Sequence, residues 1–83
     1  MTFFRRRRER RYAELLEECI ARQPDHEREH AEAHPKGGAF TPALQIEAIA
    51  RRLERKIHEA GLPLLPPDER RRRARKALCP SPG

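Results

Sequence analysis

Residues 41–61, TPALQIEAIARRLERKIHEAG, carry the strongest structural signal in the chain. Thr41 supplies a hydroxyl that can cap a helix, and Pro42 follows at the first helical position, where the missing N–H group costs nothing. Gly61 stands where a left-handed residue commonly ends a helix. Between them, apolar residues recur at three- and four-residue steps, which predicts a helix over about 42–60. Its stripe consists of Ile46, Ile49, Leu53, Ile57 and Ala60.

A second apolar stripe precedes this helix. Tyr12, Leu15, Leu16, Cys19 and Ile20 lie at i, i+3, i+4, i+7 and i+8, which predicts a helix over about 10–23 that Pro24 closes. Before Arg10 the helix is less well specified, because the macrodipole disfavours cations in a first turn. With no period-two pattern and no repeat, the fold class is all-α, and helices 10–23 and 42–60 form a hairpin.

The segments around the hairpin are polar or rich in proline. Asp25 is a good N-cap for a short, exposed connecting helix over about 25–34, which has no apolar face to bury. The residues LPLLPP, 62–67, predict a connector that presses its three leucines onto the open end of the hairpin. A C-terminal basic helix follows over about 68–78, and residues 79–83 are expected to form a disordered tail.

The length of the chain limits it to one small domain over residues 1–83. A chain of this size buries only about 60% of its unfolded surface, so its core is thin. We therefore expect a homo-oligomer or a subunit of a complex, and two hairpins that complete a dimeric four-helix arrangement are the simplest case.

Two cysteines, Cys19 and Cys79, are too few for the disulfide framework of a small secreted scaffold. The N-terminal basic run lacks the apolar stretch of a signal peptide or a membrane span. These features favour a cytoplasmic protein that does not interact with membranes.

Positive charge gathers at both ends of the chain. The formal net charge is +6, yet residues 13–34 contain seven acidic residues against two basic ones. Residues 1–12 contain six arginines against one glutamate, and residues 61–83 contain six basic residues against two acidic ones. Whatever the protein binds through these ends is therefore expected to be negatively charged.

The arginine clusters place like charges four residues apart, as in Arg6 and Arg10 or Arg71 and Arg75, which destabilises a helix. The chain gains nothing internally from such pairs, whereas phosphates would neutralise them and release counterions. We therefore predict a small non-catalytic regulatory or accessory protein that binds nucleic acid mainly through the phosphate backbone. The candidate residues are Arg5, Arg6, Arg7, Arg8, Arg10, Arg11, Arg70, Arg71, Arg72, Arg73, Arg75 and Lys76.

Other interpretations remain open. The clusters lack a helix-turn-helix, an RNA-binding motif or a zinc finger, and a charge run is often only a solvated face. The thin core equally suits a protein-binding adaptor, an inhibitor or a small subunit that docks on an acidic or apolar partner surface. The arginines of the 42–60 helix could also be neutralised within the hairpin, where Glu14, Glu17 and Glu18 would pair with Arg51, Arg52 or Arg55.

A third alternative is a metal-binding protein. His26, His30 and His34 lie four residues apart, and imidazoles at this spacing can chelate zinc. Against it, the row drifts around the helix by about 40° per four residues, so three rings do not meet one ion. Cys19 also lies on the core stripe, where a thiol usually serves packing.

Catalytic signals are weaker still. The sequence has no nucleophile elbow and no glycine-rich phosphate loop before a helix, and Lys36–Gly38 lack the rest of a P-loop. His58 lies beside the apolar stripe and is expected to be a partly covered structural residue. We predict that the protein is not an enzyme and needs no cofactor.

Overall fold

A computed structural model describes the backbone of residues 2–79 and the side chains of residues 6–79. Over this range the chain forms four α-helices and no strand: α1 (Thr2–Ala21), α2 (Gln23–Ala33), α3 (Pro42–Glu59) and α4 (Pro67–Leu78). The predicted all-α class is therefore confirmed. The predicted tail lies outside the described residues, apart from the exposed Cys79.

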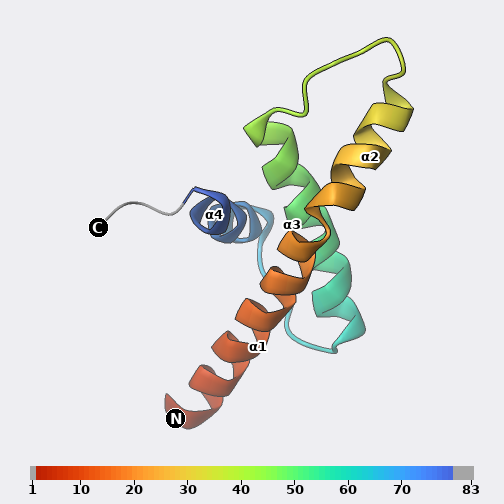
Figure 1. Cartoon of the computed structure of the whole chain (residues 1–83). Coiled ribbons are helices and arrows are strands. Elements are labelled where there is room, and N and C mark those ends of the chain that lie inside the picture. Colours follow the sequence, from red (N-terminus) through yellow and green to blue (C-terminus); the bar gives the residue numbers. More distant parts are fainter. Residues whose placement is uncertain (1, 80–83) are drawn as a thin grey trace.

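The helices pack around α3. Helices α1 and α2 follow one another as a bent rod alongside α3, and α4 packs against α3 with its axis turned out of their plane (Figure 1). The N-terminal half of α1 extends beyond the other helices (Figure 1). Helix α3 contacts all three other helices and is therefore the centre of the fold.

Both ends of α3 form as the sequence predicts. The Thr41 side-chain oxygen accepts a hydrogen bond from the Leu44 N–H group at 3.3 Å. At the other end Gly61 adopts a φ of 70°, and the N–H group of Leu62 donates to the Ile57 carbonyl at 3.1 Å. This is a Schellman ending, in which a side chain at Gly61 would be strained.

The two predicted apolar stripes form most of the core. Its buried residues come from α1, α3 and α4, and they are Tyr12, Leu15, Cys19, Ile46, Ile49, Leu53, Ile57 and Ala74. Leu62 and Leu65 of the connector pack against this cluster, whereas Leu64 is 55% exposed, so the expectation was wrong for one of the three leucines. The Tyr12 hydroxyl also holds the connector, since it donates to the Pro63 carbonyl at 2.5 Å.

Helix α1 is longer than expected at its N-terminus. It begins at Thr2, so the arginine run lies within the helix, although the apolar stripe begins only at Tyr12. Once Tyr12, Leu15 and Cys19 are anchored in the core, extending the helix costs far less than nucleating one, and arginine is a good helix former. The repulsion between the arginines is therefore too weak to keep the helix from extending to Thr2.

The boundary between α1 and α2 is a kink. Pro24 lacks an N–H group, and the ladder resumes with the His26 N–H group donating to the Arg22 carbonyl at 3.0 Å. Helix α2 therefore begins at Gln23, and the prediction that Asp25 caps it was wrong. Asp25 lies in the first turn, where its carboxylate pairs with Arg22 and Arg28, each at 3.1 Å. The hydrogen bond from Arg22 holds the pKa of Asp25 below its usual value.

Within residues 2–79, none of the helices combines the length and the apolar content needed to cross a bilayer.

Candidate nucleic-acid interface

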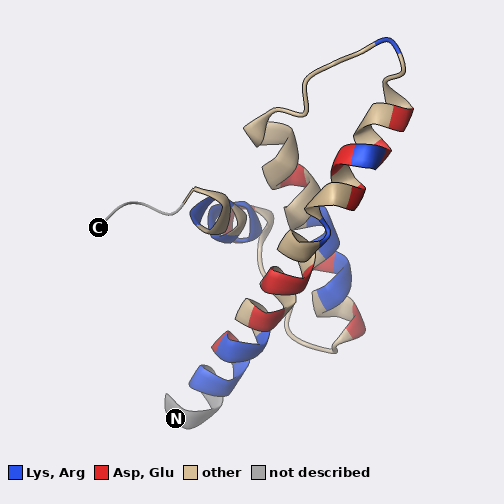
Figure 2. Cartoon of the chain, viewed as in Figure 1, with Lys and Arg blue, Asp and Glu red and all other residues tan. Residues whose placement is uncertain are grey.

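The N-terminal arginine cluster surrounds the projecting end of α1. Arg6, Arg7, Arg8, Arg10 and Arg11 are all exposed, and Figure 2 shows their segment as the blue turns near the N-terminal end of α1. Successive helical residues lie about 100° apart, so consecutive arginines point to all sides of the axis. The predicted Arg5 belongs to the same helix, and its side chain lies outside the described residues.

This cluster has little internal compensation. Arg11 pairs with Glu14 at 3.1 Å, and both side chains are about half exposed. Arg6, Arg8 and Arg10 form no ion pair with any other side chain that the structure describes. The tip of α1 therefore carries positive charge that this part of the chain does not neutralise.

The C-terminal cluster is different, because four of its five arginines, Arg70 to Arg73, pair with carboxylates of the same chain. Arg72 and Arg73 both bond Glu69, at 2.6 Å and 3.0 Å, and these bonds lower the pKa of Glu69. Arg71 contacts Asp68 at 3.1 Å within α4 and Glu47 of α3 at 2.6 Å. The expectation that the chain gains nothing internally from this cluster was wrong for these residues.

Arg70 is a structural residue. It is only 7% exposed, and its guanidinium donates to the Leu65 carbonyl and to Glu54 of α3 at 3.3 Å. Its Nε atom has no hydrogen-bond partner among the described residues. Arg70 therefore anchors α4 to α3 and to the connector, and its guanidinium is not presented to solvent.

Arg73 brings the two clusters together. It pairs with Glu9 of α1 at 3.0 Å, and its guanidinium lies 5.5 Å from the ring centroid of Tyr12. The hydrogen bond that Arg73 donates to Glu9 contributes most to raising the pKa of Arg73. Because residues three apart share a helix face, Lys76 lies on the same side of α4 and is exposed. Arg75 and Lys76 make no ion pair within the described residues.

The histidine row divides into two environments. The rings of His30 and His34 stack with centroids 4.3 Å apart, and His30 also stacks on Phe40 at 5.1 Å. His34 Nδ1 lies 3.0 Å from the His30 carbonyl oxygen. His26 points instead toward α3. Within the described residues, no three histidine, cysteine or acidic side chains are arranged to hold a metal ion.

His26 belongs to a chain of hydrogen bonds between α2 and α3. Arg52 Nε donates to His26 Nε2 at 2.8 Å, and His26 Nδ1 donates to Gln23 Oε1 at 2.8 Å. Gln23 then donates to Gln45 at 3.4 Å, and Gln45 donates to the Phe40 carbonyl at 2.8 Å. Burial, followed by the nearby charge of Arg52, lowers the pKa of His26. The prediction of an exposed α2 without a buried face was therefore wrong at this residue, which is 5% exposed.

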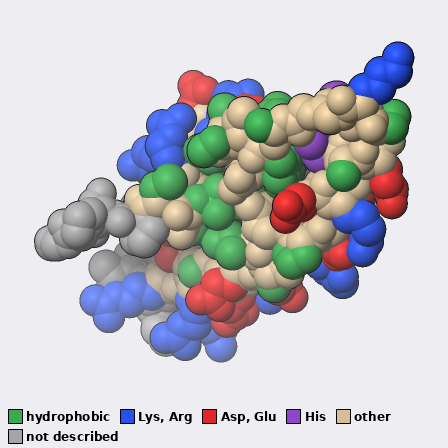
Figure 3. Space-filling model, turned by 45° about the horizontal axis from the view of Figure 1, so that its top comes forward, with side chains coloured by type: hydrophobic (Ala, Val, Ile, Leu, Met, Phe, Trp, Pro, Cys, Tyr) green, Lys and Arg blue, Asp and Glu red, His purple; other side chains and the backbone are tan. Residues whose placement is uncertain are grey.

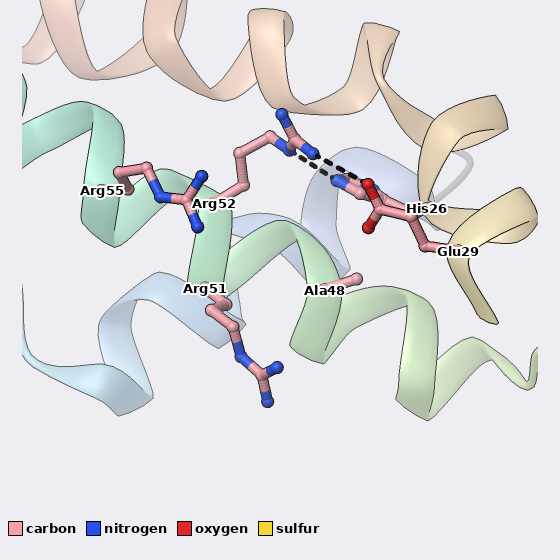
Figure 4. Close-up of a pocket in the computed structure, with 6 residues that line it drawn as sticks. All are labelled: His26, Glu29, Ala48, Arg51, Arg52 and Arg55. Atoms are coloured by element: carbon pink, nitrogen blue, oxygen red, sulfur yellow. Dashed lines mark hydrogen bonds and ion pairs between the residues drawn. The ribbon is translucent and has the colours of Figure 1, made fainter. Parts of the chain in front are cut away.

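A hollow of about 110 Å³ lies beside this network (Figure 4). It is lined by His26 and Glu29 of α2 and by Ala48, Arg51, Arg52 and Arg55 of α3. Arg52 lies 3.8 Å from Glu29, and neither Arg51 nor Arg55 has an ion pair within the described residues. The predicted pairing of Glu14, Glu17 and Glu18 with these arginines was therefore wrong.

His58 is exposed on α3, so the expectation of a partly covered position was wrong. Cys19 is fully buried, as its place on the stripe predicts, and burial raises the pKa of its thiol to about 11. Near neutral pH the thiol of Cys19 is therefore protonated, which is the less reactive form.

Comparison of the chain with models of known protein families, with characterised proteins and with solved structures finds no match.

Proposed function

We propose that the protein binds nucleic acid through its phosphate backbone, with the N-terminal half of α1 as the principal contact. The observation that carries the proposal is the group of exposed arginines Arg6, Arg8 and Arg10, which lack a carboxylate partner among the described residues. Like charges four residues apart cost a few tenths of a kcal/mol each, and phosphates would make the same arrangement favourable.

We call the N-terminal half of α1, residues 2–11, the arm. Its shape suits a helix that lies between two rows of phosphates. A helix that carries arginines on all sides can contact both walls of a groove, and the major groove of B-DNA is about 12 Å wide and admits an α-helix. Each guanidinium can hold a phosphate through two parallel hydrogen bonds. These contacts fix position and carry little sequence information.

The residues of α4 divide between two roles in this proposal. Arg75 and Lys76 extend the basic surface next to Arg73, while Arg70, Arg71 and Arg73 hold α4 against α3 and α1 through their own ion pairs. Arg72 pairs with Glu69 within α4. The contact set is therefore Arg6, Arg7, Arg8, Arg10, Arg11, Arg75 and Lys76, with Arg5 on the same helix.

Two matched charge reversals test the proposal. The variant Arg6→Glu/Arg10→Glu alters an i,i+4 pair on the arm, and Arg51→Glu/Arg55→Glu alters an equivalent exposed pair on α3. Binding of a fluorescent 20-base-pair DNA duplex is measured by anisotropy at several salt concentrations, with duplex RNA as a second probe. The arm variant should bind more weakly at all sequences, with a salt slope lower by about 2. The α3 variant should bind like wild type. Equal losses in both variants, or unchanged affinity in the arm variant, would reject the proposal.

A second candidate function is that of an adaptor or a subunit of a larger assembly. It is favoured by hydrophobic side chains that gather between α4 and the α1–α2 rod on the face shown in Figure 3. Leu16, Ile20 and Leu78 are only half-buried against the core. In the dimer expected from the sequence, the two hairpins would cover such surface. Light scattering after size-exclusion chromatography, with and without DNA, measures the mass of the particle and so shows whether the chain is a monomer or a dimer.

A further inference from the structure

One stripe of α3 faces away from the core. Leu44, Ala48, Arg51, Arg55 and His58 are spaced by four, three, four and three residues, so they follow one line along the helix. All are exposed except Ala48, which is half-buried. The spacing is that of a heptad seam, which suits the packing of another helix.

The surface along this stripe is hollowed. Three adjoining depressions of about 250, 110 and 330 Å³ share Arg51 as a lining residue. The first includes Leu44, and the last reaches Leu64 of the connector. We call this track the α3 groove, and we define it by Leu44, Ala48, Arg51, Arg55, His58 and Leu64.

The α3 groove ends in apolar side chains. Leu44 is 42% exposed and Leu64 is 55% exposed, and they are the two exposed large hydrophobic residues in the described part of the chain. Each lies at one end of the track, with Arg51 and Arg55 between them. Phe40 and Ala33 add further apolar surface next to Leu44. A phosphate backbone would gain nothing from these leucines, whereas a protein partner would bury them.

The groove has an excess of positive charge, because its carboxylates are already paired with arginines. Glu47 pairs with Arg71 of α4 at 2.6 Å, and Glu54 pairs with Arg70 at 3.3 Å. Glu29 of α2 lies 3.8 Å from Arg52. Arg51 and Arg55 therefore remain as an excess of two positive charges, with no ion pair in the described residues. Arg51 and Arg55 repel each other at i,i+4, and an acidic ligand would remove this repulsion, which adds to the free energy of binding.

We propose that the α3 groove binds an acidic amphipathic α-helix of a protein partner. The stripe from Leu44 to His58 is about 21 Å long at 1.5 Å per residue, which corresponds to about four helical turns of the partner. The partner's apolar residues would cover Leu44 and Leu64, and its carboxylates would pair with Arg51 and Arg55. The proposal is independent of nucleic-acid binding, because it uses none of the same side chains.

The test uses the full chain and three synthetic 18-residue peptides. The first is a helix with leucines at 4-3 spacing and glutamates beside them, the second replaces every glutamate by lysine, and the third scrambles the leucine positions. Anisotropy measures binding at peptide concentrations up to ~1 mM, which detects interactions as weak as about −4 kcal/mol. Amide NMR shifts of the labelled protein locate the site.

Saturable binding of the acidic helix alone, with shifts at residues 44–58 and 64, is the expected result. Arg51→Glu/Arg55→Glu should reduce that affinity by at least tenfold, and Leu64→Ser should also weaken it. Arg75→Glu/Lys76→Glu makes the same change of charge on α4 and should leave it unchanged. Equal binding of the scrambled peptide, shifts confined to α1 and α4, or no binding of the acidic helix would each overturn the proposal. The groove could instead be occupied by a second copy of the chain. The peptide would then dissociate a dimer, and the mass measured by light scattering would fall on binding. That result would identify a self-association site and would also overturn the proposal.

Discussion

The Nε–H group of Arg52 donates a hydrogen bond to Nε2 of His26 at 2.8 Å. The lone pair of the imidazole thus accepts from a side chain that is always positively charged. The ring must therefore be neutral, with its proton on Nδ1, where it donates to Gln23. The charged groups that influence the pKa of the ring are Arg52 of α3 and Glu29 and Asp25 of α2, and Arg51 and Arg55 of α3 line the hollow beside it. Protonation of His26 would remove the acceptor and leave two cations in contact.

The first prediction concerns pH. Because the pKa of His26 is lower in the folded protein than the unfolded value of 6.5, the unfolded chain binds more protons in this range. The free energy of unfolding should therefore fall as the pH is lowered from above 6.5 through the folded pKa. Urea denaturation between pH 7.5 and 5 measures this loss, and His26→Gln, which cannot titrate, should show a flatter profile. Parallel profiles would show that His26 does not titrate differently in the two states.

The second prediction concerns the two thiols. Cys19 is fully buried with a pKa of about 11, whereas Cys79 is exposed. Thiolates are the reactive form, so a disulfide reagent at pH 8 should modify one thiol per native chain quickly and the second only on unfolding. Absorbance of the released thiol measures both phases, and Cys79→Ser should remove the fast phase alone. A fast phase that survives in Cys79→Ser would contradict the burial of Cys19.

The third prediction separates the α4 arginines by their roles. Arg70→Ala should destabilise the fold by about 1.5–3 kcal/mol, because it removes charge-assisted hydrogen bonds to the Leu65 carbonyl and to Glu54. Arg75→Ala, on an exposed position of the same helix, should change stability by less than about 0.5 kcal/mol. Urea midpoints at constant m-value measure both effects. Similar losses in the two variants would mean that Arg70 does not anchor α4.

The parts of the fold that depend on local chemistry could be predicted from the sequence. The ends of α3 follow from Thr41, Pro42 and Gly61, each of which acts within one turn of its own position. The pairs of Asp68 and Glu69 with arginines three and four residues later could also have been found from helical spacing. In contrast, the pairs that α4 makes with Glu9, Glu47 and Glu54 depend on how the helices pack, and spacing in the sequence does not contain that information.

Two further features escaped prediction for different physical reasons. The start of α1 at Thr2 reflects propagation from a core-anchored helix, and a local argument about the macrodipole underestimates it. The contact between α2 and α3 depends on the hydrogen-bonded side chains of His26, Gln23 and Gln45. Because these residues are polar, no periodic apolar pattern in the sequence indicates the contact. A buried histidine satisfied at both nitrogens resembles any exposed polar residue in the sequence.

The ion pairs that fasten α4 to Glu47 and Glu54 have a consequence for the opposite edge of α3. These two carboxylates lie four residues before and three residues after Arg51, within reach of it on the helix surface. While α4 is docked they are occupied elsewhere, and release of α4 would free them to neutralise Arg51. Under the proposal that the α3 groove binds an acidic helix, docking of α4 and affinity for that helix are thermodynamically linked, so that each strengthens the other by the same factor.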